Sequence, residues 1–156
     1  MTENGSPKPF VARRMVEFQH CDPAAIVFYP RYFEMLNSVI EEWFAARNNL
    51  PFREMHGAAR RGIPTVHIDI TFKAPSRLGD GLQFEIQVRK VGGSSVALTT
   101  LCTCEGETRF VCDHTLVFMD LDTGRPKRWT DDLRRRLSAQ VITQVETELS
   151  HDRPCA

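Results

Sequence analysis

The stretch of residues 30–49 constrains the fold more than any other part of the chain. Its apolar residues recur at helical spacing, with polar residues such as Glu34 and Glu41 between them. A helix with so wide and aromatic a face must be covered on several sides. We therefore expect a buried central helix that opens at Pro30 and ends before Pro51. Its apolar positions are Tyr32, Phe33, Leu36, Val39, Ile40, Trp43 and Phe44.

Strand-like runs surround this helix in the sequence. The run 82–91 alternates apolar and polar residues, as a strand with one buried face does. Gly92 and Gly93 then predict a hairpin turn. Short antiparallel strands with one buried helix make an α+β domain, here a five-stranded sheet wrapped around the helix. One run precedes the helix at residues 10–18, and four follow it at residues 65–73, 82–91, 95–104 and 109–121.

The domain boundaries follow from composition and pattern. Residues 1–9 are rich in Pro, Gly and Ser and predict a disordered leader. We place one domain at residues 10–150 and a flexible tail at residues 151–156. Residues 51–62 predict a short second helix, and Thr130 predicts the cap of a last helix. A single sheet leaves an edge and an outer face uncovered, which favours self-association.

Charge and cysteine content exclude several classes of protein. The 20 Lys and Arg residues balance the 20 Asp and Glu residues, so a nucleic-acid partner is not expected. No stretch is long and apolar enough to predict a membrane span. The first residues lack the apolar core of a signal peptide, and the five cysteines are an odd number. We therefore expect reduced thiols and a cytoplasmic location.

Residues 21–30, which read Cys-Asp-Pro-Ala-Ala-Ile-Val-Phe-Tyr-Pro, raise the functional question. Asp22 stands before a proline, and a short apolar run leads from it into the central helix. By residue type alone, an Asx-turn is the usual role of such an aspartate. The alternative is chemistry, because a carboxylate can activate a water or attack a carbonyl carbon itself.

The same block resembles that of the hotdog-fold acyl-CoA thioesterases, and most closely the 4-hydroxybenzoyl-CoA thioesterase family. A second match is the stretch Gly-Ile-Pro-Thr-Val at residues 62–66, and the resemblance covers roughly residues 10–135. It implies hydrolysis of an acyl-CoA, with an aromatic acyl group such as hydroxybenzoyl, to the free acid and CoA. It also implies a homodimer or homotetramer and no cofactor, since coenzyme A is part of the substrate.

The resemblance assigns Asp22 as general base or nucleophile, and the residues leave that choice open. A backbone N–H at the start of the central helix would polarise the thioester carbonyl. Because Pro30 has no N–H, the donor is Phe28 or Tyr29, and the resemblance favours Tyr29. The residues expected to contact the substrate are His20, Ala25, Ile26, Pro64, Thr65, His67, Arg89, Lys90 and Ser95.

Several details depart from the family or allow another interpretation. Ala25 stands where the family usually has glycine, and the turn at Gly92-Gly93 lacks the basic cluster of the hydroxybenzoyl type. His67 is expected to face either the central helix or a partner subunit. Arg89 and Lys90 are the nearest basic pair for CoA phosphates, although a solvated strand end explains them equally well. A non-catalytic acyl-CoA or acyl-carrier binding protein is the rival function, and a hotdog dehydratase is a third.

A cluster of thiols in the last two strands invites a metal interpretation. Cys102, Cys104, Cys112 and His114 fall on adjacent predicted strands. Thiols one residue apart are not the usual spacing of a zinc site, so we expect buried free thiols and no metal.

Overall fold

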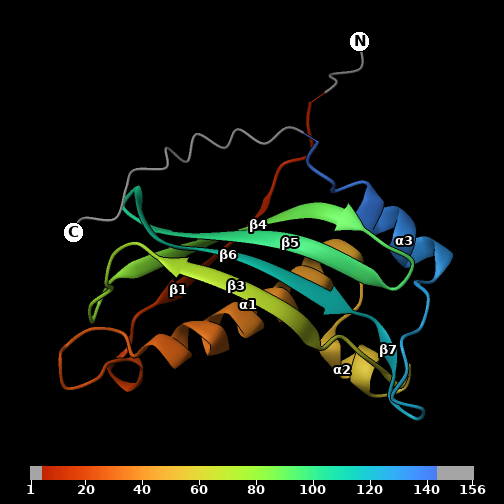
Figure 1. The fold of residues 1–156 in the computed structure, drawn as a ribbon, viewed down its shortest axis with the longest axis horizontal. Coiled ribbons are helices and arrows are strands. Elements are labelled where there is room, and N and C mark those ends of the chain that lie inside the picture. Colours follow the sequence, from red (N-terminus) through yellow and green to blue (C-terminus); the bar gives the residue numbers. More distant parts are fainter. Residues whose placement is uncertain (1–4, 144–156) are drawn as a thin grey trace.

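Alternating strands and one wide-faced helix give a curved antiparallel sheet with α1 along its inner face (Figure 1). The computed structural model describes residues 5–143. Residues 1–4 of the predicted leader, residues 144–150 of the predicted domain and the predicted tail lie outside this range. The elements are β1 (Phe10–Met15), a 3-10 turn η1 (Phe18–His20), α1 (Tyr29–Asn48), α2 (Phe52–His56), β2 (Arg61–Gly62), β3 (Thr65–Phe72), β4 (Gly81–Val91), β5 (Ser95–Cys104), β6 (Glu107–Val117), β7 (Met119–Asp120) and α3 (Asp131–Ser138).

The main sheet has the order β1-β4-β5-β6-β3, with each neighbouring pair antiparallel. The predicted five-stranded sheet is therefore confirmed. β5 has the predicted bounds, and the hairpin before it closes through the Gly92 N–H, which donates to Ser95 O at 2.8 Å. Alternate residues of β4 are buried on the inner face, among them Leu82 and Phe84.

Helix α1 supplies the other half of the core. Val39, Trp43 and Phe44 have no exposed surface, and the Tyr32 ring lies 5.2 Å from that of Phe110 on β6. The predicted central helix is confirmed at both ends. It ends because Asn49 adopts a left-handed backbone conformation with φ 51°, a common way to cap a helix.

Two of the predicted strands end at least three residues earlier than predicted, and the other strand boundaries of the main sheet agree to within two residues. β1 ends at Met15, because the chain turns into η1, where the Glu17 N–H donates to His20 Nδ1 at 2.8 Å. The predicted strand 109–121 is divided at Phe118, whose N–H donates to Ser94 O at 2.7 Å. The part after this break is β7, which pairs with the unpredicted β2. The break could not be seen in the sequence, because apolar residues continue through it to Met119 and Leu121.

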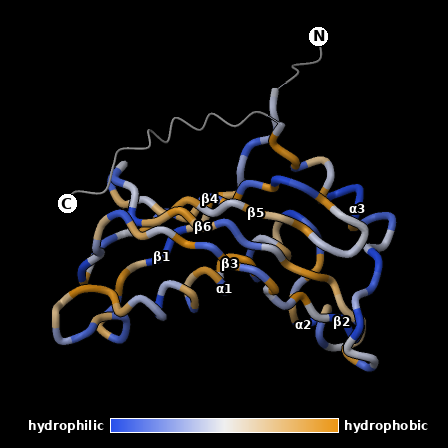
Figure 2. The backbone as a smooth tube through the Cα atoms, in the orientation of Figure 1, coloured by the Kyte–Doolittle hydropathy of each residue, from blue (hydrophilic) through white to orange (hydrophobic). Residues whose placement is uncertain are grey.

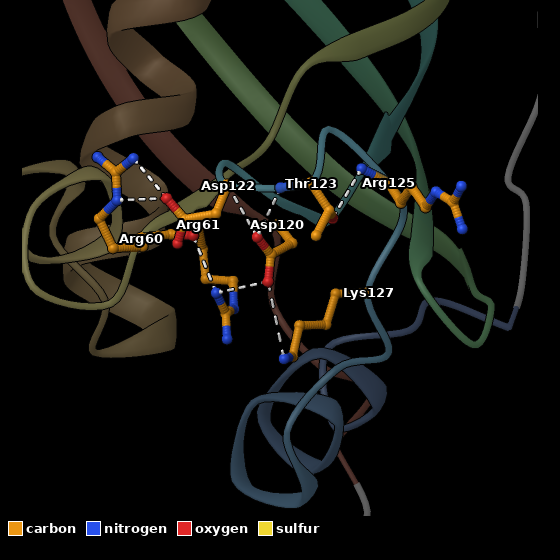
Figure 3. A network of polar contacts seen from close by, with 7 residues as sticks. All are labelled: Arg60, Arg61, Asp120, Asp122, Thr123, Arg125 and Lys127. Carbon is orange, nitrogen blue, oxygen red and sulfur yellow. Dashed lines mark hydrogen bonds and ion pairs between the residues drawn. The ribbon is translucent and has the colours of Figure 1, made fainter.

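A polar network holds the turn after β7 (Figure 3). Asp120 Oδ1 accepts hydrogen bonds from the N–H groups of Asp122 at 2.8 Å and Thr123 at 3.1 Å. Its Oδ2 forms an ion pair with Arg61 at 3.2 Å. The backbone N–H groups, followed by Arg61 and Lys127, hold the pKa of Asp120 below its usual value. This network ties the short β2–β7 sheet to the turn.

Helix α3 is largely hydrophilic along its length (Figure 2), with Leu133 and Leu137 buried. Thr130 caps it as predicted, since Thr130 Oγ1 accepts a hydrogen bond from the Leu133 N–H. Among the described residues, no helix is both long and apolar enough to cross a membrane.

Candidate functional site

The loop that carries Asp22 is closed by its own backbone. Cys21 and Val27 form an antiparallel bridge across its base. The Asp22 N–H donates to Ile26 O at 3.0 Å, and the Ala25 N–H donates to Asp22 O at 2.9 Å. These bonds fix the loop directly before α1, so the position of Asp22 is set by backbone geometry.

The Asp22 side chain uses only one of its oxygens for the loop. Oδ1 accepts a hydrogen bond from the Ala24 N–H at 2.8 Å, which is the contact of an Asx-turn. Within residues 5–143, no hydrogen bond or ion pair engages Oδ2. The carboxylate is partly exposed. The structure therefore contains the expected Asx-turn, and Asp22 Oδ2 remains free to bind a substrate or a water.

The start of α1 offers one free backbone donor beside this loop. The Phe28 N–H is already used, because it donates to His20 O at 2.9 Å. Pro30 has no N–H. For the Tyr29 N–H, no acceptor lies within hydrogen-bond distance among the described residues. Tyr29 is the first residue of the helix, where the helix dipole favours negative charge.

His20 and Ala25 also belong to this end of the molecule. His20 Nδ1 accepts a hydrogen bond from the Glu17 N–H, so the neutral imidazole carries its proton on Nε2. Ala25 has φ 63°, in the left-handed region that favours glycine. Ile26, the next residue, is partly buried. The glycine usual in the family thus corresponds to a position whose backbone conformation suits glycine.

Three exposed aromatic rings lie next to the loop and form what we call the aromatic shelf: Phe28, Tyr29 and Phe72. Their side chains are 46%, 59% and 43% exposed, respectively. The Phe28 and Tyr29 ring centroids are 5.6 Å apart, and those of Tyr29 and Phe72 are 6.5 Å apart. Exposed aromatic rings grouped in this way mark a surface suited to an apolar or aromatic ligand.

The other predicted contact residues lie at the opposite end of the sheet. Phe72, at the end of β3, touches Tyr29 and Tyr32, whereas Thr65 begins the strand about 20 Å away. Pro64 directly precedes Thr65. Arg89, Lys90 and Ser95 are at that far end too, because β5 and β6 place Val96 in register with Leu116, the partner of Thr65.

His67 and Arg89 come together on the outer face of the sheet. They line a shallow groove of about 300 Å³ with Thr99, Asp113 and Thr115. His67 therefore does not face α1. Within one chain, the structure unites Asp22, Tyr29, His20, Ala25 and Ile26 at one end of the sheet, and the remaining predicted residues at the other.

Comparison with known proteins decides the family. The model of the thioesterase-like superfamily matches residues 16–137. The chain belongs to this superfamily. The predicted assignment to thioester-hydrolysing enzymes is thus confirmed at the level of the family. No curated protein matches the chain in sequence.

Solved structures show that this superfamily member has the hotdog fold, as predicted. A 1,4-dihydroxy-2-naphthoyl-CoA thioesterase from Synechocystis has a TM-score of 0.75 at 17% identity, over 83% of this chain and 96% of that one. A gentisyl-coenzyme A thioesterase has a TM-score of 0.75 at 21% identity, over 82% and 99%. A hypothetical protein from Staphylococcus aureus in complex with CoA has a TM-score of 0.83 at 14% identity, over 99% and 100%.

One cavity of this thioesterase-like chain lies away from the Asp22 loop. A cavity of about 340 Å³ lies at the C-terminal end of α1, between Leu50, Phe118 and Leu133. It contains none of the predicted site residues. The aromatic rings of Phe28, Tyr29 and Phe72 beside the Asp22 loop are instead exposed to solvent.

The thiols predicted in the last strands lie in the core of this hotdog domain. Burial raises the pKa of both Cys102 and Cys112 to about 12, which makes these thiols poor nucleophiles. His114 is also buried, and burial lowers its pKa to about 4. Its Nε2 lies 2.9 Å from Thr100 Oγ1. Over residues 5–143, no group of three or more His, Cys, Asp or Glu side chains is arranged to hold a metal ion.

One residue without a predicted site role, Ser76, contacts both the Asp22 loop and α1. Ser76, in the connection between β3 and β4, accepts the Val27 N–H through its carbonyl at 2.8 Å. Its hydroxyl bonds the Tyr32 side chain. Nothing in the sequence around Ser76 marks this role, since the contact joins segments 44 residues apart.

Proposed function

We propose that this chain hydrolyses an acyl-CoA thioester to the free acid and CoA. In this proposal Asp22 is the reacting carboxylate, and the Tyr29 N–H donates to the thioester carbonyl oxygen. One observation carries this proposal. The Asp22 loop and the start of α1 that follows it hold both a carboxylate oxygen, Asp22 Oδ2, and a backbone amide, Tyr29 N–H, that form no hydrogen bond among the described residues. A carbonyl oxygen bound at the amide becomes anionic in the transition state, where the donor has its greatest effect.

Two routes fit these groups, and both need only water and the chain. As nucleophile, Asp22 Oδ2 bonds to the carbonyl carbon, the C–S bond breaks, and CoA leaves as thiolate. Water then hydrolyses the resulting anhydride and restores the carboxylate. As general base, Asp22 takes a proton from a water that attacks the same carbon, and the thiolate again leaves. Neither route requires a resident cofactor.

We propose an aromatic acyl group as the preferred substrate. The aromatic shelf offers ring faces beside Asp22, and aromatic rings pack favourably edge-to-face or offset. Two of the similar structures bear the names of enzymes for dihydroxynaphthoyl and gentisyl thioesters. The shelf and these names support the same class of substrate.

The site is proposed to be completed by a second copy of the chain. β3 is an edge strand with exposed apolar side chains, Val66 at 60%, Ile68 at 41% and Phe72 at 43%. Such an edge is a template for strand pairing. When two β3 strands pair antiparallel about a two-fold axis, the start of each strand lies beside the end of the other.

This pairing explains why the predicted residues occupy two ends of one chain. It brings Thr65 and Pro64 of the partner subunit next to Phe72 and the Asp22 loop. Arg89 and Lys90 of the partner subunit arrive at the same end, where they are proposed to contact the CoA phosphates. The assembly is a homodimer, or a homotetramer made of two such dimers.

The test is hydrolysis of a panel of aromatic and aliphatic acyl-CoA esters, followed by release of the CoA thiol. We expect Asp22→Asn to lower kcat by a factor of roughly 10³ or more, because the amide neither attacks nor accepts a proton. Asp131→Asn, the same exchange on the exposed start of α3, should leave kcat unchanged. Full activity of Asp22→Asn would remove Asp22 from the mechanism.

The rival function is non-catalytic binding of an acyl-CoA or acyl-carrier. The observation that favours it is the methyl group of Ala25, at a position where the backbone conformation suits glycine. A pocket can persist after chemistry is lost. Saturable binding of an acyl-CoA by the wild-type chain, without thiol release from any ester of the panel, would establish this function instead.

A further inference from the structure

Ser76 contacts both halves of the candidate site at once. It has no exposed surface and lies in the connection between β3 and β4. Its carbonyl accepts the Val27 N–H at 2.8 Å, which holds the end of the Asp22 loop. Its Oγ accepts the Tyr32 hydroxyl at 2.8 Å, which holds the first turn of α1. One buried residue therefore ties the loop to the helix.

We propose that Ser76 and Tyr32 are positioning residues that fix the Asp22 carboxylate relative to the Tyr29 N–H. We call the pair the Ser76–Tyr32 clamp. The inference rests on the proposed function and goes beyond it, because neither side chain touches the reacting atoms. Catalytic groups must be held to within a fraction of an ångström, so a small shift between them reduces the rate.

The segment that carries Ser76 is itself held firmly. Arg109 Nη1 donates to Pro75 O at 2.7 Å, one residue before Ser76. Arg109 also forms an ion pair with Asp80 at 3.5 Å. On the other side of Ser76, the Gly79 N–H donates to Val16 O at 2.9 Å. The segment with Ser76 is thus fixed to β6 and to the residue that follows β1, so the clamp links the sheet to the candidate site.

Tyr32 is well placed to remain a donor. Its ring packs between Phe72, at 5.7 Å, and Phe110, at 5.2 Å, and its side chain is 4% exposed. Burial raises the pKa of its hydroxyl above the ordinary value, so it stays protonated in neutral and mildly alkaline solution. The clamp therefore adds no ionisation of its own to the pH profile of the reaction.

Two substitutions remove the clamp without touching the backbone contact. Tyr32→Phe and Ser76→Ala each delete one hydroxyl and keep the Ser76 carbonyl. The control is Thr100→Val, which deletes a hydroxyl of the same burial in the middle of the sheet, where it bonds His114 at 2.9 Å. All three chains lose one buried hydrogen bond, and their activities are measured well below their melting temperatures.

We expect each clamp variant to lower kcat by about tenfold or more, with KM within about twofold of wild type. The double variant should lose no more than either single variant, because both remove the same hydrogen bond. Thr100→Val should keep the wild-type kcat. Equal kcat in the clamp variants and Thr100→Val, at equal stability, would overturn the inference and leave the proposed function intact.

A second readout needs no substrate. Amide hydrogen exchange of Val27, whose N–H donates to the Ser76 carbonyl, should be faster in the clamp variants than in wild type and in Thr100→Val. Unchanged exchange in both clamp variants would also overturn the inference. A wild-type chain that hydrolyses no ester overturns the proposed function, and in that case the exchange rates alone decide whether the clamp fixes the loop to the helix.

Discussion

The proposed mechanism gives the Asp22 carboxylate a chemical purpose in addition to its structural one. Oδ1 accepts the Ala24 N–H and so stabilises the turn, while Oδ2 has no hydrogen-bond partner among the described residues. A carboxylate that swung freely would spend little time in a reactive orientation, and the turn removes that freedom. The structural and the chemical interpretations of this residue are therefore complementary, and substitution of Asp22 by any residue affects both.

Ala25 provides a residue-scale prediction about stability. At φ 63° a non-glycine residue is strained by about 1–2 kcal/mol, whereas glycine loses about 0.5–1 kcal/mol more backbone entropy on folding. We expect Ala25→Gly to raise the free energy of unfolding by about 0.5–1 kcal/mol in urea titrations. The matched control is Ala24→Gly, which should lower it, since Ala24 has no positive φ to relieve. Destabilisation by Ala25→Gly would contradict the strain argument.

His114 makes the stability of the fold depend on pH. Its pKa is about 4 in the folded chain, below the ordinary value of 6.5, because burial opposes the charge. Between these two values the unfolded chain binds a proton that the folded chain does not. The free energy of unfolding should therefore fall by up to about 3 kcal/mol as the pH is lowered from 6.5 to 4.

Urea titrations from pH 7 to pH 4.5 measure this slope. In His114→Gln the titrating group is gone, so we expect the slope over this range to flatten relative to wild type. The control Thr100→Val removes the partner of His114 but keeps the imidazole. Identical slopes in wild type and His114→Gln would mean that other groups govern the acid sensitivity.

At the scale of elements, substitutions at the start of α1 can distinguish the role of the Tyr29 side chain from that of its backbone amide. Tyr29 is the first helical residue, a position that accepts proline, and Phe28 before it is extended with ψ 121°. Tyr29→Pro therefore removes the proposed donor with little change in backbone. Tyr29→Ala removes the ring and keeps the N–H.

We expect Tyr29→Pro to lower kcat by about 10²-fold relative to Tyr29→Ala, the usual loss when one such donor is removed. Circular dichroism should show the same helix content in both variants. Equal kcat values in the two would show that the Tyr29 amide does not polarise the thioester.

Helices and strands could be predicted where the spacing of apolar residues along the sequence shows which face of the element is buried. Alternation of apolar and polar residues predicted β4, runs of strand-forming residues predicted the other strands of the main sheet, and helical spacing predicted α1. β2 was not predicted, because β2 and its partner β7 have two residues each and are too short to show a periodic pattern of apolar residues. In the candidate site, the motif located the Asp22 loop, but the Ser76 contact joins distant segments by packing alone. The outward orientation of His67 depends on register, which a bulge between Thr65 and His67 alters.

At the scale of the whole molecule, the division of the predicted residues between two ends of the sheet needs an explanation. Asp22 and the aromatic shelf lie at one end of β3, and Thr65 begins the other. A monomer would leave each group alone on an open surface. In the proposed dimer with paired β3 strands, the Asp22 end of each chain lies beside the Thr65 end of the other, which gives two complete sites. The pairing also covers apolar side chains such as Ile68, which is 41% exposed in the single chain.

Mixed dimers provide a test of this arrangement. Asp22→Asn removes the carboxylate from its own site, and Thr65→Trp should block the site of the partner subunit with a bulky ring. Each variant alone should be nearly inactive. In a dimer of one chain of each kind, one site carries both changes, and the other carries neither. Random mixing gives half mixed dimers, each with one intact site of two, so activity should return to about a quarter of wild type.

The measurement is thiol release after the two inactive variants are unfolded together and refolded. Each variant refolded alone is the control, and size-exclusion chromatography confirms that all samples contain dimers. Recovery is possible only if Asp22 and Thr65 in one site come from different chains. If both belonged to the same chain, every site in the mixture would carry one of the two changes, and no activity would return.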